Sequence, residues 1–565
     1  MQYADIGGTI TLRDPSQVMQ LDRMGSFHQS RLSFMRVLLR RLKSQSWTFE
    51  KRLFDINAKG VGRAVYTAHG PDHSYSLVAF ANDLPPEKRS DRVIATEWDA
   101  TFTLFDGIPS EADLDRLQGN VPKQEAGRVS EKELSLSRAN RSVRLWEYVV
   151  GELAAGRQPD QAQVDAVGYL MRTTAVYGSG KFGAADREQS DAREECSGPF
   201  QIEMLSVYLT RAFVMDLVEH MARMRAPDVA VPLEPALRRR FGIGNSTGLG
   251  MAPFLLTHPA LISCWMSARE TALGRIRALP AASQDEADYF RQIAARAQLH
   301  AANWHSEHPV QVTKLAALRE DMAALQAHLA TSNLIDDHPW DRLYRWAEAT
   351  LSLEGQELVV SLLMEPYGAL VDELSSCMAV DETECWRIDG AMALEELRAL
   401  MDEVYGWART IDWDRRENDA RVWYVSEAKL EPRLGERYDE PIEAYEQPLS
   451  PGRDAARMMR DLDGFEGAVT ADFLLAYPEH RHVVRRAQIA RRFPYAEIRD
   501  NTISATMMPI DLLRAKLAFF GACHFDPRSD RWVRINMFQH APFPHELADG
   551  NADDWTYPLL KGQAA

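Results

Sequence analysis

The stretch QIEMLSVYLTRAFVMDLVEHMARM, residues 201–224, repeats apolar residues at the three- and four-residue spacing of an α-helix. The same spacing is found in LWEYVVGELAAG (145–156), VDAVGYLMRTTAVY (164–177) and ELVVSLLMEPYGALVDELSSCM (357–378). We therefore predict a helical body over residues 126–415 and a mainly α fold class, with α+β regions at both ends of the chain.

One pattern in this body is longer than an ordinary helix. Apolar residues keep helical spacing from about Asp285 to Ala330, and only Pro309 interrupts them. The pattern fits two helices stacked end to end or a helical hairpin. Because long helices often pack into bundles across subunits, we predict a homo-oligomer formed through residues 285–378.

The N-terminal region has a different pattern. After a predicted helix in HQSRLSFMRVLLRRLKSQ (28–45), short aromatic and β-branched runs alternate with turn residues, as consecutive antiparallel strands do. This predicts an N-terminal α+β domain over residues 1–125, with an antiparallel sheet and a helix. The runs are WTFEKRLFDI (47–56), RAVYTAHG (63–70), SYSLVAFAND (74–83) and RVIATEWDATFTLFDG (92–107).

The C-terminal region mixes both patterns, which predicts an α+β domain over residues 416–565. Whether its strands complete the N-terminal sheet stays open at this point. Strands are predicted in ARVWYVSEAKL (420–430) and RWVRINMFQ (531–539), and helices in TADFLLAYPEHRHVVRRAQIARR (470–492) and PIDLLRAKLAFFG (509–521).

Charge and composition limit the partners. The 565-residue chain has a formal net charge of −17, which argues against nucleic-acid binding and against an anionic membrane surface. Its 5 cysteines form no CxxC pair, and no run approaches the ~18 apolar residues of a membrane span. We expect a cytoplasmic protein whose partner is a small anionic molecule, bound in a locally positive site.

The segment GIGNSTGLG (242–250) is the first candidate for such a site. It contains G-x-S-x-G, but a nucleophile elbow needs a buried strand directly before it, and LEPALRRRF (233–241) does not predict one. No Walker lysine follows the glycines. Converging backbone N–H groups favour an anion cradle instead. The predicted substrate-binding residues here are Arg240, Gly244, Asn245 and Thr247, with Ser246 as a catalytic residue that donates to the anion or to an oxyanion.

The segment YGSGKFG (177–183) is the second candidate. Its G-x-G-x-x-G string lacks the preceding strand and following helix of a dinucleotide site, because residues 164–177 have a helical pattern. It presents Lys181, flanked by Arg172 and Tyr177. Both glycine segments flank residues 201–225 and are predicted to converge. The structural alternative is that both are glycine turns that cap helices.

Acid–base chemistry is assigned to Lys181 and Glu203, although a carboxylate in the first turn of a helix is also favoured by the helix dipole. In VSEAKLEPRLGER (425–437), Glu427 and Arg433 are predicted to contact the substrate, since guanidinium groups suit planar anions. We predict that the polar residues 184–198 form a mobile cover. The histidines lack the spacing of a metal site, and the sequence identifies no cofactor.

The sequence therefore predicts an enzyme that acts on a carboxylate or phosphate metabolite by elimination, addition or group transfer, which is lyase or transferase chemistry. The alternative is a non-catalytic oligomeric binding or assembly protein, in which the glycine segments are caps and the long helices form a subunit interface.

Overall fold

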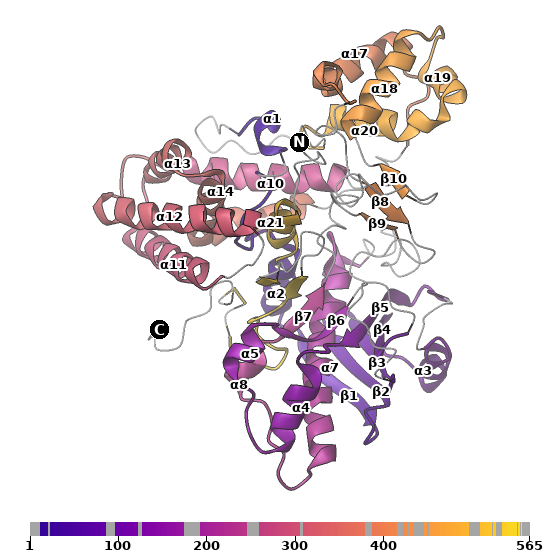
Figure 1. Ribbon diagram of the computed structural model, residues 1–565, viewed down its shortest axis with the longest axis vertical. Coiled ribbons are helices and arrows are strands. Elements are labelled where there is room, and N and C mark those ends of the chain that lie inside the picture. Colours follow the sequence, from indigo (N-terminus) through magenta and orange to yellow (C-terminus); the bar gives the residue numbers. More distant parts are fainter. Residues whose placement is uncertain are drawn as a thin grey trace. The chain divides into compact units, whose positions relative to one another are not determined.

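The computed structural model (Figure 1) divides the chain into two compact units. The sheet unit comprises residues 28–247, 517–528 and 532–565, and the helical unit comprises residues 1–27, 248–516 and 529–531. The structure describes residues 12–20, 23–85, 97–121, 127–173, 193–245, 259–304, 309–378, 387–414, 422–425, 430–432, 446–448, 451–496, 509–521, 524–526, 534–550, 552–553 and 555.

The sheet unit contains a nine-stranded sheet of order β1-β2-β3-β4-β5-β6-β7-β12-β11. Neighbouring strands are antiparallel except β6 and β7, which are parallel. The strands are β1 (Thr48–Ile56), β2 (Gly62–His69), β3 (Ser74–Ala81), β4 (Ala100–Asp106), β5 (Glu133–Arg141), β6 (Tyr169–Thr173), β7 (Gly242–Asn245), β11 (His524–Asp526) and β12 (Arg534–Met537).

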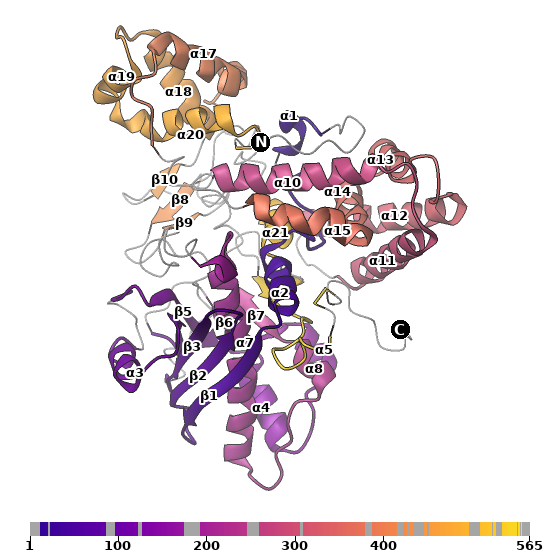
Figure 2. The same ribbon diagram turned by 180° about the vertical axis from the view of Figure 1, so that it is seen from behind.

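A long helix, α7 (Gln201–Arg225), packs against one face of this sheet (Figure 2). Of its 25 residues 18 are buried, as expected of a helix that is apolar all round. The Tyr208 ring lies 6.1 Å from that of Phe49 in β1 and 5.4 Å from that of Phe538, which follows β12. Phe49 belongs to the first strand of the sheet order and Phe538 lies beside its last strands, yet both rings contact Tyr208. The sheet therefore curls around α7.

Shorter helices cover the rest of the sheet unit. The predicted N-terminal helix is α2, which packs against α7. On the other face of the sheet, Leu114 and Leu117 of α3 pack against Val65, Val78 and Phe105. The remaining elements are α2 (Phe34–Ser44), α3 (Glu111–Gln118), α4 (Trp146–Ala154), α5 (Gln161–Asp165), η2 (Glu194–Cys196) and α8 (Pro235–Arg239).

The antiparallel strands β1–β4 were predicted, but three strands fall in the stretch predicted to be helical. Residues 164–177 are not one helix, because β6 occupies Tyr169–Thr173. Every residue of β6 is buried, and a strand buried on both faces has no two-residue alternation by which to recognise it. The structure also corrects the expectation that no buried strand precedes Ser246, because the buried strand β7 ends at Asn245.

The C-terminal strands settle the question that the sequence left open. β12 pairs with β7, so the predicted strand in residues 531–539 joins the sheet that starts near the N-terminus. The division of the chain into three domains, residues 1–125, 126–415 and 416–565, stays a prediction.

The helical unit contains the predicted long helices. α11 and α12 are separate helices that pack against each other, so the hairpin alternative is confirmed. Helices α17–α20 enclose a second core, which includes Met401, Met458, Phe473 and Val484. The α-helices are α1 (Pro15–Val18), α10 (Pro259–Arg277), α11 (Gln284–Asn303), α12 (Pro309–Thr331), α13 (Pro339–Thr350), α14 (Leu353–Leu363), α15 (Gly368–Val371), α17 (Leu394–Tyr405), α18 (Pro451–Asp463), α19 (Thr470–Ala476), α20 (Arg481–Arg492) and α21 (Pro509–Phe520).

Shorter elements complete this unit. A three-stranded sheet of order β10-β8-β9 includes the strand predicted in residues 420–430. Within the residues that the structure describes, no helix is both long and apolar enough to cross a membrane. The short elements are η4 (Glu365–Tyr367), η5 (Asp372–Met378), η6 (Gly406–Thr410), β8 (Val422–Val425), β9 (Leu430–Pro432), β10 (Glu446–Pro448) and η8 (Pro478–His480).

Candidate functional site

The parallel pair β6 and β7 brings together the two strand ends from which the chain continues toward YGSGKFG and through GIGNSTGLG. Thr173, the last residue of β6, pairs with Asn245, the last residue of β7. YGSGKFG begins four residues after Thr173, and the string G-N-S-T-G continues directly through Asn245. The convergence of the two segments stays a prediction, because YGSGKFG and the residues after Asn245 lie outside the described part of the chain.

The chain between these strands includes α7, so β6, α7 and β7 form a β-α-β unit (Figure 1). In open α/β sheets ligands bind outside the carboxyl ends of parallel strands. Here only β6 and β7 are parallel, and β5 and β12, on either side, run antiparallel to them.

The glycines of β7 have a packing role. A methyl group at Gly244 would lie 2.6 Å from Cγ of Tyr169, and one at Gly242 would lie 2.5 Å from the carbonyl oxygen of Met537. Both glycines therefore allow close approach of neighbouring groups. The predicted role of Gly244 in binding an anion stays a prediction beside this structural role.

One face of the sheet carries two arginines near the carboxyl end of β6. Arg172 pairs with Asn140 of β5, so Arg138, two residues before Asn140, lies on the same face as a diagonal neighbour. The guanidinium of Arg138 lies 4.4 Å from the ring centroid of Trp98, and burial lowers the pKa of Arg138 to about 10. Arg172 is 4% exposed. Arg138 remains cationic at neutral pH. Because Arg138 pairs with Thr101 and the neighbouring Phe102 faces α7, both arginines lie on the face of the sheet opposite α7.

Glu203 lies in the first turn of α7 and is partly exposed. The Nε of Arg211 donates to the carbonyl oxygen of Phe241 at 2.7 Å, which fixes the level of α7 against β7. Asn245 is four residues further along the strand, about 13 Å. On α7, which runs in the opposite direction to β7, Glu203 lies eight residues before Arg211, a distance of about 12 Å along the helix axis. Glu203 is therefore nearly level with the end of β7.

The segment before α7 is held by side chains. Arg41 of α2 donates through Nη1 to the carbonyl oxygens of Glu195, at 3.2 Å, and of Ser197, at 2.6 Å. The Tyr75 hydroxyl donates to the Glu195 carboxylate at 3.0 Å. The predicted cover over residues 184–198 is thus anchored at residues 195–197. Its residues 184–192 lie outside the described part of the chain.

The structure places the remaining predicted residues as follows. Arg240 precedes β7 at its amino end and donates to both carboxylate oxygens of Asp165 at 2.8 Å, so it does not join Arg172 and Asn245. Six predicted residues lie outside the described part of the chain, and their roles stay predictions: Lys181, Ser246, Tyr177, Thr247, Glu427 and Arg433.

Sequence reasoning missed Arg138. Its signal was present in ELSLSRANR (133–141), where apolar and polar residues alternate at the start of the run, as in a half-buried strand. Recognising this strand would have placed Arg138 and Asn140 on one face.

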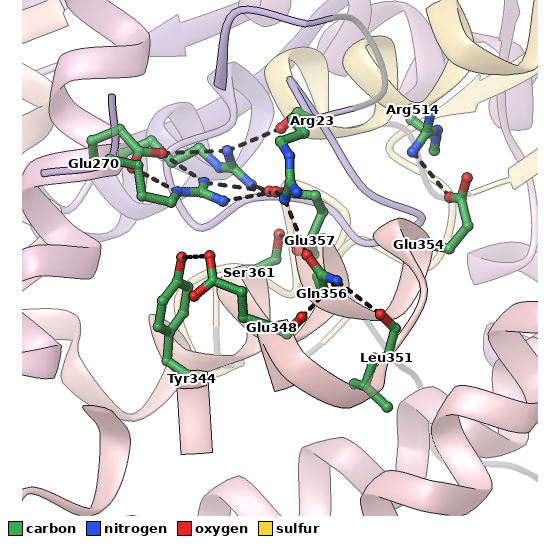
Figure 3. A network of polar contacts seen from close by, with 12 residues as sticks. Arg23, Glu270, Tyr344, Glu348, Leu351, Glu354, Gln356, Glu357, Ser361 and Arg514 are labelled. Carbon is green, nitrogen blue, oxygen red and sulfur yellow. Dashed lines mark hydrogen bonds and ion pairs between the residues drawn. The ribbon is translucent and has the colours of Figure 1, made fainter. Parts of the chain in front are cut away.

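The helical unit has its own concentration of buried charge (Figure 3). Glu357 of α14 accepts hydrogen bonds from Arg13 at 2.7 Å and Arg269 at 2.5 Å, and Arg13 also donates to Glu270 at 2.8 and 2.9 Å. Burial alone would raise the pKa of Glu357, but Arg13 and Arg269 outweigh it and hold this pKa at about 2. All these carboxylates and guanidiniums have charged partners, so no charge of the cluster is buried uncompensated.

Comparisons with known proteins do not add a family to this description. The chain matches no family model, no curated protein and no solved structure. Functional inference therefore rests on the site itself.

Proposed function

We propose that the sheet unit binds a small anionic molecule, a carboxylate or phosphate, at the carboxyl ends of β6 and β7. The observation that carries this proposal is the pairing of Thr173 with Asn245, the last described residues before YGSGKFG and before the rest of GIGNSTGLG. Glycine-rich backbone N–H groups bind anions well, and the cationic Arg138 and Arg172 add positive charge to a protein whose net charge is −17.

The proposed chemistry is elimination, addition or group transfer beside the bound anion, as in a lyase or transferase. Glu203 acts as one acid–base group, because it is nearly level with the end of β7. Lys181 acts as the second and Ser246 as a hydroxyl donor or nucleophile. The buried strand directly before Ser246 removes the main objection to a G-x-S-x-G nucleophile, since such a serine follows a buried strand.

Anion binding is tested by following the melting temperature of the purified protein with inorganic phosphate and with succinate. Wild type is expected to be stabilised by one of them, since a ligand at 100 times its dissociation constant adds about 2.7 kcal/mol. Arg172→Gln is expected to lose this stabilisation. Arg240→Gln, an arginine at the other end of the strand, is the matched control and keeps it. Equal stabilisation of the two variants would contradict the proposal.

The assembly alternative rests on a different observation. Tyr289 of α11 and Val312 of α12 are 39% and 47% exposed, although the hairpin that carries them is well packed inside. A homo-oligomer formed through residues 285–378 would cover such side chains. Light scattering at two protein concentrations tests it, and a monomer at both would contradict it.

A further inference from the structure

The segment directly before α7, residues 193–200, is attached to the rest of the sheet unit mainly through polar groups. Of the side chains that the structure describes in this segment, only those of Cys196 and Pro199 are buried. A segment with few buried apolar contacts opens at a lower free energy than a core element does. The polar attachments therefore decide whether this segment stays in place.

Arg41 of α2 makes the central attachment. Its Nη1 atom donates to the carbonyl oxygens of Glu195 and Ser197, at 3.2 and 2.6 Å. Hydrogen bonds from a charged donor are stronger than those from a neutral one. One guanidinium group thus bridges two carbonyl groups of the segment.

The sheet provides three further attachments. The Tyr75 hydroxyl donates to the Glu195 carboxylate at 3.0 Å, and the backbone N–H of Asp72 donates to the same carboxylate at 3.3 Å. Arg193 forms an ion pair with Asp106, the last residue of β4. These contacts are part-buried or exposed, so water can replace each of them without opening the core.

The segment ends in a strained residue. Phe200, at the N-cap of α7, has φ 59° and ψ 15°, in the left-handed region. The Cβ atom makes this conformation costly, and a bulky residue adopts it only where its surroundings enforce it. The rings of Phe34 and Phe520 surround Phe200 here, with centroids 5.0 and 5.3 Å from its own.

Strain alone does not make a segment movable, as Phe538 shows. Its φ of 57° is equally unusual, but its side chain is 0% exposed and lies between the rings of Tyr208 and Trp555. Core packing therefore holds Phe538. Phe200 is partly exposed and ends a segment that polar contacts hold, so the strain at Phe200 is released when those contacts break.

The first turn of α7 depends on this segment. The backbone N–H of Met204 donates to the carbonyl oxygen of Phe200 at 2.8 Å, and Glu203 lies three residues after Phe200. The backbone conformation of Phe200 therefore sets how the chain enters the helical turn that carries Glu203.

We propose that residues 193–200 form a strained latch with two states. In the docked state described above, Arg41, Tyr75 and Asp106 hold the latch while Phe200 is strained. In the released state these contacts are broken and Phe200 relaxes, which frees the first turn of α7. This inference goes beyond the proposed function, because it holds whether or not an anion binds at the carboxyl ends of β6 and β7.

Hydrogen exchange of the full chain, followed by mass spectrometry, tests the latch. The amides of residues 195–198 are expected to exchange at least about tenfold faster than those of residues 207–213 in the middle of α7, because the latch opens without the rest of the helix. Equal protection of the two sets would overturn the proposal, because the latch would then open only when the sheet unit unfolds.

Arg41→Gln removes the central attachment. It is expected to speed exchange at residues 195–198 by at least about tenfold and to change exchange at residues 207–213 by less than about twofold. Arg40→Gln is the matched control, since Arg40 also lies in α2 and also donates to a carbonyl oxygen, but its described partners, Arg31 and Asp553, lie outside the latch. The proposal fails if the two variants exchange alike at residues 195–198, or if Arg41→Gln speeds exchange equally at residues 207–213.

Two variants of Phe200 isolate the strain. Phe200→Gly and Phe200→Ala both remove the ring, but alanine is strained at this φ and glycine is not. Exchange at residues 195–198 is expected to be about two- to fivefold slower in Phe200→Gly than in Phe200→Ala. Position 200 is not adjacent to these amides, so their intrinsic exchange rates are the same in both variants. Equal exchange, or faster exchange in Phe200→Gly, would show that the docked latch stores no strain.

Discussion

The charge cluster around Glu357 and the helix α7 both bury polar side chains, but these side chains are paired differently. Around Glu357, each carboxylate and guanidinium has a charged partner within hydrogen-bond distance. Around Ser206 and Thr210, buried hydroxyls have no partner within the described residues. A buried polar group with a partner is compensated for its loss of water, whereas one without a partner costs stability.

The largest expected effect on stability comes from removing one charge of the paired cluster. Glu357→Gln leaves Arg13 and Arg269 buried without the opposing charge, and we expect a loss of about 3–5 kcal/mol in the free energy of unfolding. Urea unfolding followed by circular dichroism measures it. Glu373→Gln is the matched control, because Glu373 also pairs with an arginine but is 62% exposed, and a loss of at most about 1 kcal/mol is expected. Equal losses would show that the buried cluster has no special role.

The same carboxylate predicts a pH dependence. The pKa of Glu357 is about 2 in the folded chain and about 4.3 in an unfolded one. Because the folded pKa is depressed, the stabilisation is present above pH 4.3 and is lost as the pH falls toward 2, by about 3 kcal/mol. The difference in unfolding free energy between wild type and Glu357→Gln should shrink over this window. A constant difference from pH 7 to pH 2 would contradict it.

A smaller effect tests the packing of the strand that leads into the site. Gly244→Ala places a methyl group against the Tyr169 ring, and we expect a loss of about 1–3 kcal/mol. Gly151→Ala in α4 is the control, since a methyl group there meets nothing within 4 Å and should stabilise the helix by about 0.5–1 kcal/mol. If Gly244→Ala is as stable as wild type, the glycine is not needed for packing and its role is functional.

The smallest expected effect on stability comes from removing a buried hydroxyl that has no partner within the described residues. Ser206→Ala removes a hydroxyl without a partner, so we expect the free energy of unfolding to change by less than about 0.5 kcal/mol or to rise. Ser361→Ala removes a hydroxyl that bonds a helix carbonyl and lies 3.0 Å from Ser26, and a loss of about 1 kcal/mol is expected. The two melting curves measured together decide whether the two buried serines differ.

Part of this architecture was predictable from sequence because it is local. Alternation and turn residues predicted β1 to β4, and helical spacing interrupted at Pro309 predicted α11 and α12 with their hairpin as one alternative. β6 was not predictable in this way, because five buried residues have no period and its partners are distant in sequence. Its parallel pairing with β7 depends on tertiary structure.

The site was predictable to a similar degree. Arg172, Glu203 and Asn245 were chosen from sequence, and the structure places them at or near the carboxyl ends of β6 and β7. Arg138 was not chosen, because the alternation in ELSLSRANR was not interpreted as a strand, and only the pairing of Asn140 with Arg172 brings it near the end of β6.

The position of β12 has a consequence for biosynthesis. This strand, Arg534–Met537, comes from the last part of the chain but lies inside the sheet, between β7 and β11. Until it has left the ribosome, β7 is an edge strand with unpaired backbone groups on one side, a known template for aggregation. Pairing so distant in sequence is also slow. The strand that leads into the candidate site therefore gains its second neighbour only after nearly the whole chain has been made.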